Sequence, residues 1–340
     1  MPRSEIEGKD NSSEDKSNYK VVCKGDMVYN SMRMWQGANG VSNYDGIVSP
    51  AYTVLMPTEE IDNQYFAALF KTSNLINEFR KNSQGLTSDT WNLKYPQIRP
   101  IRLYIPSLQE QNKISSFIGT LEERIGKQRQ LVDSLKKYKR GLLNSLITQK
   151  LKFTPGQIWR TTKLGDIFQE RTERAIGDEE LLAVTIRSGV QKRDEINLKD
   201  NSSDDKSHYK RVYKGDLVYN TMRMWQGASG VSLFDGIVSP AYTVVTPIDA
   251  AGTNIIFWSY YFKFVPLVRT FQKYSQGLTS DTWNLKFPQF SEIKVSVPSL
   301  KEQTSIADFL SRIDKKIQRE ENKLRACQRL RTALMQQLFI

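Results

Sequence analysis

The sequence consists of two similar halves, and this internal repeat limits what the chain can fold into. The stretch YNSMRMWQGANGVSNYDGIVSPAYTV (29–54) returns almost unchanged as residues 219–244, and SQGLTSDTWNLKYPQ (83–97) returns as residues 275–289. Equivalent residues are 190 positions apart at Glu5 and Glu195 and 192 apart at Ser83 and Ser275. A period this long predicts two whole domains and excludes the short units of a solenoid.

One segment breaks the symmetry of the repeat. The second copy is preceded by the opening segment TTKLGDIFQERTERAIGDEELLAVTIRSGVQKRD (Thr161–Asp194), which has no counterpart before Glu5. We predict a strand, a helix and a strand in the opening segment. The first domain is then either truncated or completed by another segment, and the sequence leaves both readings open.

Each repeat contains a mixed region followed by a long helix. Short alternating apolar runs such as GIVSPAYTVLMP (46–57) predict strands between turns, and residues 65–81 predict a helix. A Pro-Ser-Leu sequence follows, in which Ser107 or Ser299 is placed to cap a helix that continues to the end of the repeat. The predicted fold class is α+β, with two mixed α/β domains (1–106 and 150–298) and two helices (107–149 and 299–340).

Both predicted helices carry a heptad repeat. Apolar spacings of three and four alternate, which is the pattern of a coiled-coil seam. The seam positions are Ile118, Leu121, Ile125, Gln128, Val132, Leu135, Lys139, Leu142 and Leu146, and then Leu310, Ile313, Ile317, Glu320, Leu324, Cys327, Arg331, Leu334 and Leu338. The same two rungs are polar in both helices, which predicts a device that sets the register. Packing of each helix against a globular core is the alternative.

The simplest partner of each helix is the other one. We expect antiparallel pairing, with an approximate twofold axis relating the two repeats and their ligand sites. At about 1.5 Å per residue, some 39 residues give a rod of roughly 58 Å. We expect this rod to hold the two domains apart.

Charge favours a polyanionic partner. The formal net charge is +12, from 49 Lys and Arg against 37 Asp and Glu, and nucleic acid is the commonest polyanion that a basic protein binds. A solvated basic surface is the alternative. Two cysteines are too few for a disulfide framework, so we expect a cytoplasmic protein. Lys263 and Pro266 interrupt the most apolar window, Ile255–Val268, so we expect no membrane span.

The SPAY sequence at 49–52 and 239–242 resembles the Asp/Asn/Ser-Pro-Pro-Tyr/Phe loop of amino-methyltransferases, which holds the target amino group. The second proline of that loop is Ala51 or Ala241 here, and neither repeat contains a strand, glycine-rich turn and helix for a cofactor. We therefore predict that SPAY is a strand with a packed tyrosine.

No other residues form a catalytic or metal-binding pattern. The single histidine, His208, corresponds to Asn18, and we expect it to lie in an exposed loop. Cys23 corresponds to Tyr213, and Cys327 lies on the heptad seam as a small apolar residue. We expect no metal site, no bound cofactor and no enzymatic chemistry in this chain.

Two polar loops recur in both repeats and suit DNA contacts. Arginine reads guanine and asparagine or glutamine reads adenine, while hydroxyls and lysine suit phosphate. Tryptophan can brace a loop or pack against a sugar. The candidate residues of the first repeat are Asn30, Arg33, Trp35, Gln36, Asn39, Gln84, Thr87, Ser88, Asn92 and Lys94. Those of the second are Asn220, Arg223, Trp225, Gln226, Ser229, Gln276, Thr279, Ser280, Asn284 and Lys286. Ordinary turns with structural tryptophans are the alternative.

Over essentially its whole length, the chain resembles the specificity subunit of a type I restriction-modification enzyme. The resemblance is carried by GLTSDTWNLK in each repeat, by IPSLQEQNKISSFIGTLEERI (105–125) and VPSLKEQTSIADFLSRIDKKI (297–317), and by the helix ends LKKYKRGLLNSLI and LRTALMQQLFI. It implies two target recognition domains on an antiparallel helical spacer, each reading half of a split site in double-stranded DNA.

The resemblance also implies partners. Modification subunits, two of them by expectation, would carry S-adenosylmethionine and methylate adenine. Restriction (translocase) subunits, which use ATP and Mg²⁺, would cleave unmodified DNA in host defence. The chain itself would be a non-catalytic specificity subunit.

Because the loops of the two repeats are nearly alike, we predict a near-palindromic target, with one short half-site and its inverted copy around an unread gap. A turn of DNA is roughly 34 Å, so the predicted rod suits half-sites about one to two turns apart. Two alternatives remain from the residues alone. One is a coiled-coil adaptor whose loops bind protein, and the other is a fused methyltransferase or nuclease, which the absent cofactor motifs oppose.

Overall fold

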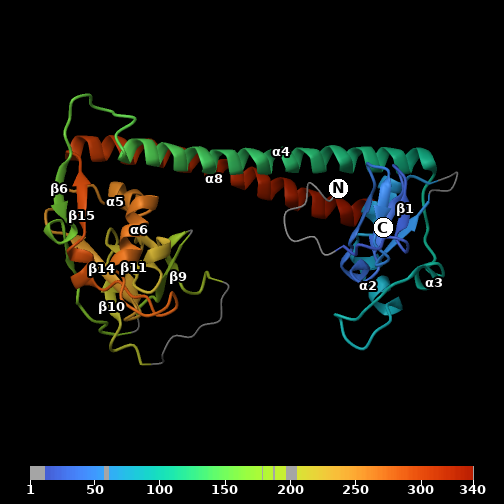
Figure 1. Cartoon of the computed structure of the whole chain (residues 1–340), viewed down its shortest axis with the longest axis horizontal. Coiled ribbons are helices and arrows are strands. Elements are labelled where there is room, and N and C mark those ends of the chain that lie inside the picture. The colour runs from blue at the N-terminus through green and yellow to red at the C-terminus, as the bar shows by residue number, and fades with distance from the viewer. Residues whose placement is uncertain (1–11, 57–60, 178, 187, 197–204, 340) are drawn as a thin grey trace. The chain divides into compact units, whose positions relative to one another are not determined.

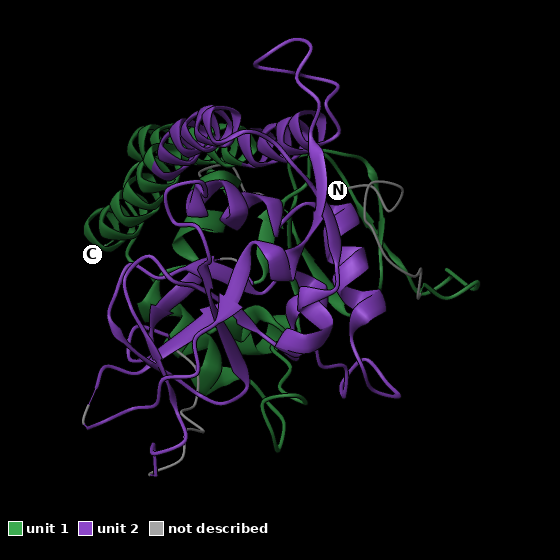
Figure 2. Ribbon diagram, turned by 90° about the vertical axis from the view of Figure 1, so that its left-hand side faces the viewer, with its two compact units in different colours: residues 1–132, 319–340 green, residues 133–318 purple. Residues whose placement is uncertain are grey.

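A computed structural model describes residues 12–56, 61–177, 179–186, 188–196 and 205–339 (Figure 1). Residues 1–11, and residues 197–204, which are equivalent to 7–14, lie outside the described residues. The chain divides into two compact units. Unit 1 is Met1–Val132 with Arg319–Ile340, and unit 2 is Asp133–Gln318 (Figure 2). Each unit therefore combines one repeat with a part of both long helices.

Unit 2 contains an antiparallel sheet with helices packed against it. Its four-stranded sheet has the order β12-β11-β14-β7, and β10-β13, β15-β6 and β8-β9 form antiparallel pairs. The strands are β6 (Arg160–Lys163), β7 (Phe168–Glu170), β8 (Leu182–Thr185), β9 (Gly189–Lys192), β10 (Lys210–Val212), β11 (Leu217–Asn220), β12 (Ser229–Val231), β13 (Gly236–Val238), β14 (Tyr242–Pro247) and β15 (Lys294–Val297). The helices are the 3-10 turns η3 (Leu164–Asp166) and η4 (Met224–Gln226), with α5 (Ile255–Tyr261), α6 (Val265–Tyr274) and α7 (Phe287–Ser291).

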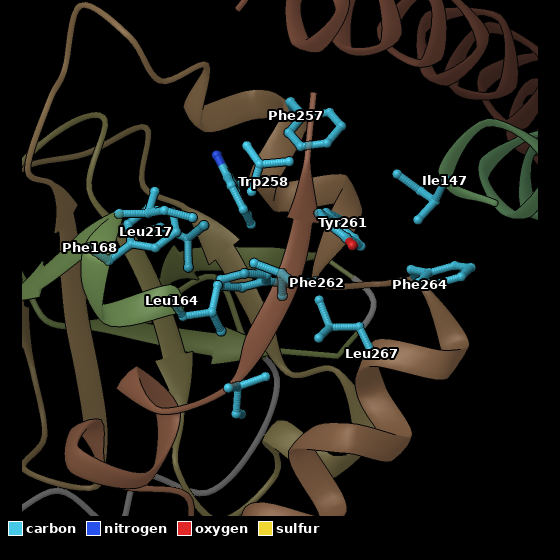
Figure 3. Packing of buried hydrophobic residues seen from close by; sticks show 14 of the residues in the cluster. Ile147, Leu164, Phe168, Leu217, Phe257, Trp258, Tyr261, Phe262, Phe264 and Leu267 are labelled. Carbon is cyan, nitrogen blue, oxygen red and sulfur yellow. The ribbon is translucent and has the colours of Figure 1, made fainter. Parts of the chain in front are cut away.

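Aromatic residues of α5 form the centre of the unit 2 core. Trp258 packs edge-on against Phe168 of β7 at a ring distance of 5.2 Å. Figure 3 shows Phe257, Trp258 and Tyr261 on the face of α5 that is turned toward the strands. Burying large rings supplies the apolar area that stabilises a domain of this size.

Unit 1 repeats this arrangement with fewer strands. Its three-stranded sheet has the order β3-β2-β5, and β1 pairs with β4. The elements are β1 (Lys20–Val22), β2 (Met27–Asn30), η2 (Met34–Gln36), β3 (Asn39–Val41), β4 (Gly46–Val48), β5 (Tyr52–Leu55), α1 (Asn63–Leu69), α2 (Ser73–Asn82) and α3 (Tyr95–Ile98). Met27 faces Leu55 in unit 1 as Leu217 faces Val245 in unit 2, so the strand register is the same.

Three local predictions are wrong. Residues 65–81 form two helices, α1 and α2, because Thr72 turns extended between them. In unit 2 the same break precedes Pro266, which fits only the first turn of a helix. SPAY is a turn between β4 and β5, closed by the bond from Tyr52 N to Ser49 O, and Tyr52 is 36% exposed. In unit 2 the bond from Tyr242 N to Ser239 O closes the same turn.

The third wrong prediction concerns the opening segment. Its described residues form β6, β7, β8 and β9, and the predicted helix is only the three-residue turn η3. The physical reason is that strands β14 and β15 each have an edge that needs hydrogen-bond partners. Strand β7 pairs with that edge of β14, and strand β6 pairs with that edge of β15. The hydrogen bonds of these edges favour strands over a helix.

The long helices are α4 (Leu108–Ile147) and α8 (Leu300–Leu338). As predicted, Ser107 and Ser299 lie at their starts, each with its Oγ 3.4 Å from the backbone nitrogen three residues on. Every seam position is buried or half-buried. Among the described residues, no helix is both long and apolar enough to cross a membrane.

The predicted polar rungs make the contacts between the helices. In unit 1, Gln128 Nε2 donates to Glu320 Oε2 at 2.8 Å, and Arg331 donates to Glu122. In unit 2, Lys139 Nζ donates to Asp314 Oδ1 at 2.6 Å. Residue numbers on α8 fall as those on α4 rise, so the pairing is antiparallel in each unit, as predicted.

Each helix also completes the core of the unit that holds the other repeat. Leu143, Leu146 and Ile147 at the end of α4 belong to the core of unit 2, and Figure 3 labels Ile147 there. Met335 near the end of α8 packs with Ala68 and Ile118 in unit 1. The helices therefore form a seam and join globular cores as well, so both interpretations of their apolar faces hold in part.

We predict that the pair Glu122–Arg331 sets the register and can be inverted. Glu122→Arg alone should lower the free energy of unfolding of unit 1 by about 1 kcal/mol, because two cations then face each other. Adding Arg331→Glu should restore it, as thermal denaturation would show. Glu123→Arg is the control, since Glu123 contacts Lys127 on its own helix. Rescue of Glu123→Arg by Arg331→Glu would contradict the register.

Candidate nucleic-acid interface

The first predicted loop is held in one conformation by its own side chains. We call it the tryptophan loop (30–39 in unit 1, 220–229 in unit 2). Asn30 Oδ1 accepts a bond from Met32 N at 3.0 Å, and Trp35 Nε1 donates to Met32 O at 3.1 Å. Unit 2 repeats both bonds at the same distances. Gly37 closes the loop with φ 77°, in the left-handed region that glycine favours.

The second predicted loop is a tight hairpin. We call it the tip hairpin (83–94 in unit 1, 275–286 in unit 2). Gln84 pairs with Asn92 across its base, and Thr87 N donates to Thr90 Oγ1 at 3.1 Å near its tip. Gly85 has φ 142°, and a Cβ there would lie 2.6 Å from Thr90 O, so this position requires glycine. Equivalent bonds close the hairpin of unit 2.

The structure brings the two loops together in each unit. Leu93 N donates to Ser31 O at 2.8 Å, and the rings of Trp35 and Trp91 meet edge to face at 5.2 Å. In unit 2, Leu285 N donates to Thr221 O at 2.9 Å, and Trp225 meets Trp283 at 5.2 Å. Two stretches about fifty residues apart therefore form one surface.

A lysine supports the tryptophan loop of unit 2 from behind. Lys263 Nζ donates to the backbone oxygens of Gly227 and Ser229, the latter at 2.8 Å. Burial of this ammonium group lowers its pKa to about 8. Its equivalent, Lys71, has a pKa lowered by the same cause. The sequence signal for this role was a lone cation in an apolar window, which we interpreted only as a barrier to membrane insertion.

Burial separates the predicted residues into three groups. The exposed ones are Arg33, Gln36, Gln84, Thr87, Ser88 and Lys94, with Arg223, Gln226, Gln276, Thr279, Ser280 and Lys286. The half-buried ones are Asn30, Trp35, Asn39 and Asn92, with Asn220, Trp225 and Asn284. Asn30 and Trp35, like their equivalents, already bond the loop backbone, so they shape the surface.

Ser229 alone is fully buried, with 0% exposure. Its hydroxyl donates to Gly227 O at 3.4 Å, and the backbone of Gly189 in β9 lies against Gly230 beside it. A ligand at the surface cannot reach this side chain, so the assignment of Ser229 to DNA contact is wrong.

The prediction from the residues missed apolar side chains on the same surface. Met32 and Met222 are 40% and 39% exposed, and Leu86 and Leu278 at the hairpin tips are 101% and 100% exposed. Single exposed apolar residues are common on protein surfaces, so these side chains matter only as part of the surface that both loops form. The signal that could have found them is the repeat, which keeps both residue types in both loops.

A cleft of about 290 Å³ lies at the base of the loops in unit 2. Met222, Asn284 and Lys286 line it, together with Pro240 and Ala241 of the SPAY turn. Asn284 Oδ1 is buried without a hydrogen bond among the described residues, and so is the equivalent Asn92 Oδ1. Both oxygens are buried, so they do not face a ligand, while the exposed Lys286 adds positive charge to the cleft.

The described residues contain no group of three or more His, Cys, Asp or Glu that could hold a metal ion. His208 is exposed in a turn, as predicted. Cys327 is half-buried on the seam and Cys23 is exposed.

The comparisons with known proteins identify the family. The model of the type I restriction modification DNA specificity domain matches residues 5–137 and again residues 157–327. The chain belongs to this family. The resemblance in the sequence is thereby confirmed, and with it the interpretation of the chain as a specificity component and not a catalytic one.

Three known proteins are similar to this chain. The HindI specificity subunit of Haemophilus influenzae is 27% identical over 132 residues, which is 37% of this chain and 28% of that protein. The crystal structure of the type I S subunit from M. genitalium has a TM-score of 0.60 at 15% identity, over 94% of this chain and 84% of that one. A structure from a study of type I complex assembly has a TM-score of 0.57 at 16% identity, over 96% and 84%. The structural likenesses confirm the fold class.

We predict that Lys263 fixes the tryptophan loop. Lys263→Met should lower the free energy of unfolding of unit 2 by about 1–3 kcal/mol, because the backbone oxygens of Gly227 and Ser229 lose their donor. Amide hydrogen exchange in residues 224–230 should also become faster. Lys273→Met, on the exposed face of α6, is the control. Unchanged exchange in the loop would contradict a supporting role.

Proposed function

We propose that this chain is the DNA-reading subunit of a type I restriction-modification complex. In this proposal each unit reads half of a split target in double-stranded DNA. The observation that carries it is the surface formed by the tryptophan loop and the tip hairpin, which recurs with the same bonds in both units of a specificity-family chain. A net charge of +12 suits a DNA partner.

The exposed side chains suit the chemistry of a groove. Arg33 and its equivalent Arg223 can donate two bonds to guanine, and the glutamines can pair with adenine. Thr87, Ser88 and Lys94 suit phosphate oxygens. Met32 and Leu86 add apolar contacts of the kind that recognise a thymine methyl group. The rigid backbone keeps these groups in place before binding, which reduces the entropy lost on association.

The likeness of the loops supports a near-palindromic target. The closing glycines have nearly the same conformation, with φ and ψ of 77° and 23° at Gly37 and 79° and 25° at Gly227. Equivalent side chains on equivalent backbones read the same bases. We therefore infer one half-site and its inverted copy, separated by a gap that the helices set.

The partners and cofactors follow from the same proposal. Modification subunits, two per complex, bind S-adenosylmethionine and methylate adenine within the target. Restriction subunits use ATP and Mg²⁺ to translocate and cleave DNA. The complex acts in the cytoplasm. The alternative function is an adaptor that binds protein through the same loops, which the basic charge of the chain does not favour.

We predict a symmetric methylation pattern. Cells that co-express this chain with its modification subunits should carry methylated adenines only within an inverted repeat around a fixed gap, as sequencing of modified bases would show. Cells with the modification subunits alone are the control. Two unrelated half-sites would contradict the argument from the loops, and absence of sequence-specific methylation would contradict the proposed function.

We predict equal roles for the two loop arginines. Arg33→Ala and Arg223→Ala should each weaken binding to the cognate duplex by about ten- to a hundredfold and relax specificity at the base that each contacts. Arg129→Ala, an exposed change on α4, is the control. Fluorescence anisotropy with cognate and scrambled duplexes at two salt concentrations would measure both effects. Binding that ignores salt and sequence would favour the adaptor instead.

A further inference from the structure

The opening segment covers strands of unit 2 whose equivalents in unit 1 are not covered by any described residue. In unit 2, β6 pairs with β15 and β7 pairs with β14. The start of the hairpin β8-β9 bonds to β13 through Ile237 N and Glu180 O, at 2.8 Å. In unit 1, residues 102–105 are equivalent to β15 but form no strand, and β5 is an edge of its sheet.

The equivalent surface of unit 1 is apolar. Ile47 is 51% exposed, whereas its equivalent Ile237 is 0% exposed. Ile105 is 45% exposed, whereas its equivalent Val297 is 5% exposed. Tyr104, beside Ile105 in the chain, is fully exposed as well. We call this surface, with β1, β4, the free edge of β5 and residues 102–105, the bare face.

One apolar cluster of unit 2 has no full counterpart among the described residues of unit 1. In unit 2, three residues of the opening segment pack with four valines of the sheet: Leu182, Val184 and Val190, with Val212, Val218, Val238 and Val244. Unit 1 keeps a valine at all four equivalent sheet positions, 22, 28, 48 and 54. Three of these valines are half-buried, and only Val22 is buried. The sheet of unit 1 therefore retains one side of a cluster whose other side no described residue supplies.

Two glycines of unit 1 are equivalent to glycines of unit 2 that contact the opening segment closely. In unit 2, a Cβ on Gly236 would lie 2.3 Å from Glu180 O, and a Cβ on Gly230 would lie 2.7 Å from Gly189 Cα. Close approach of the opening segment therefore requires both glycines. Their equivalents, Gly46 and Gly40, have no atom within 4 Å of a Cβ and no positive φ. Nothing in the described part of unit 1 requires glycine at either place.

A buried carboxylate of unit 1 also differs from its equivalent in unit 2 in its ionic partner. In unit 2, Arg171 of the opening segment forms two hydrogen bonds with the buried carboxylate of Asp216, at 2.9 and 3.1 Å. The equivalent Asp26 is also buried, and it accepts a bond from Cys23 N. Among the described residues, no cation contacts Asp26. A buried carboxylate without a cation favours a partner that brings one.

We propose that the bare face is a docking surface for a polypeptide segment of the opening-segment type. The occupant forms strands against residues 102–105 and the edge of β5, lays apolar residues on the four valines, and pairs an arginine with Asp26. Only the comparison of the two units carries this inference, and it does not depend on DNA recognition.

The test uses the full chain and a labelled peptide of residues 157–194. Saturable binding of one peptide per chain is expected, by fluorescence anisotropy. Hydrogen exchange should slow by about tenfold or more in β1, β4 and residues 102–105, because added strands and burial protect these amides. Slowing confined to unit 2 would mean that the peptide replaces its own copy there, and it would overturn the proposal.

Matched variants make the test specific. Gly46→Ala should leave the free chain as stable as before, because its Cβ meets no atom. It should weaken peptide binding by about tenfold or more, because the Cβ would overlap the incoming backbone. Gly126→Ala on α4 is the control, and there too a Cβ would meet no atom. A peptide with Arg171→Met should also bind more weakly, since it leaves Asp26 unpaired. Equal binding by all variants would overturn the proposal.

A covalent graft of the segment tests the proposal even where the free peptide does not fold. Residues 157–194 placed directly before Glu5 reproduce the junction between Asp194 and Glu195 in the second repeat. The graft should slow exchange in β1, β4 and residues 102–105, and Gly46→Ala in the graft should reverse this. A graft that leaves the exchange of unit 1 unchanged would overturn the proposal, whatever the peptide does.

Discussion

The polar contacts between α4 and α8 are the constraint on which the rest of the structure depends. The ion pairs Glu122–Arg331 and Asp314–Lys139 are equivalent to each other in the two repeats, and Gln128 bonds its own equivalent, Glu320. An apolar heptad seam can slide by one turn at little cost, whereas a shift here would leave charged groups without partners. With this register, the end of each helix reaches the core of the unit that holds the other repeat. Neither repeat therefore completes its core with its own sequence.

Sequence patterns predicted the features that depend on periodicity and repetition. The heptad seam and its polar rungs follow from spacing, because burial on one face of a helix imposes that spacing. The helix starts follow from the Pro-Ser-Leu sequence before each helix. The break before Pro266 and the SPAY turn were missed, since short apolar runs fit a helix, a strand or a turn equally well. The strands of the opening segment were partly missed for a different reason. They form because β14 and β15 present free edges, and no local pattern in residues 161–194 contains that information.

The candidate site shows a similar division. Asn30 and Gln36 both carry side-chain amides in one loop, so the sequence predicts a base contact equally for both. Their neighbours separate them: Asn30 bonds Met32 N, whereas Gln36 is exposed. Ser229 and Asn39 are equivalent residues, yet the backbone of β9 lies beside Ser229, and the described part of unit 1 contains no counterpart of that strand. Residues that can contact DNA and residues that hold the loop in shape thus differ in burial and hydrogen bonding. The amino-acid sequence of a loop does not contain this information.

Two parts of unit 1 depend unequally on a segment of the opening-segment type, which the described residues of unit 1 do not contain. The tryptophan loop and the tip hairpin are supported by β2, α2 and the pair Trp35–Trp91, all of which lie within the repeat. Their closing bonds and glycine angles match those of unit 2, although no described residues of unit 1 form a counterpart of β6 to β9. The segment matters instead for the apolar cluster and for Asp26, because among the described residues the four valines lack the apolar partners that their equivalents have, and Asp26 lacks a cation. The surface that we propose for DNA therefore forms without the opening segment. Full burial of the valines in the sheet, in contrast, requires such a segment.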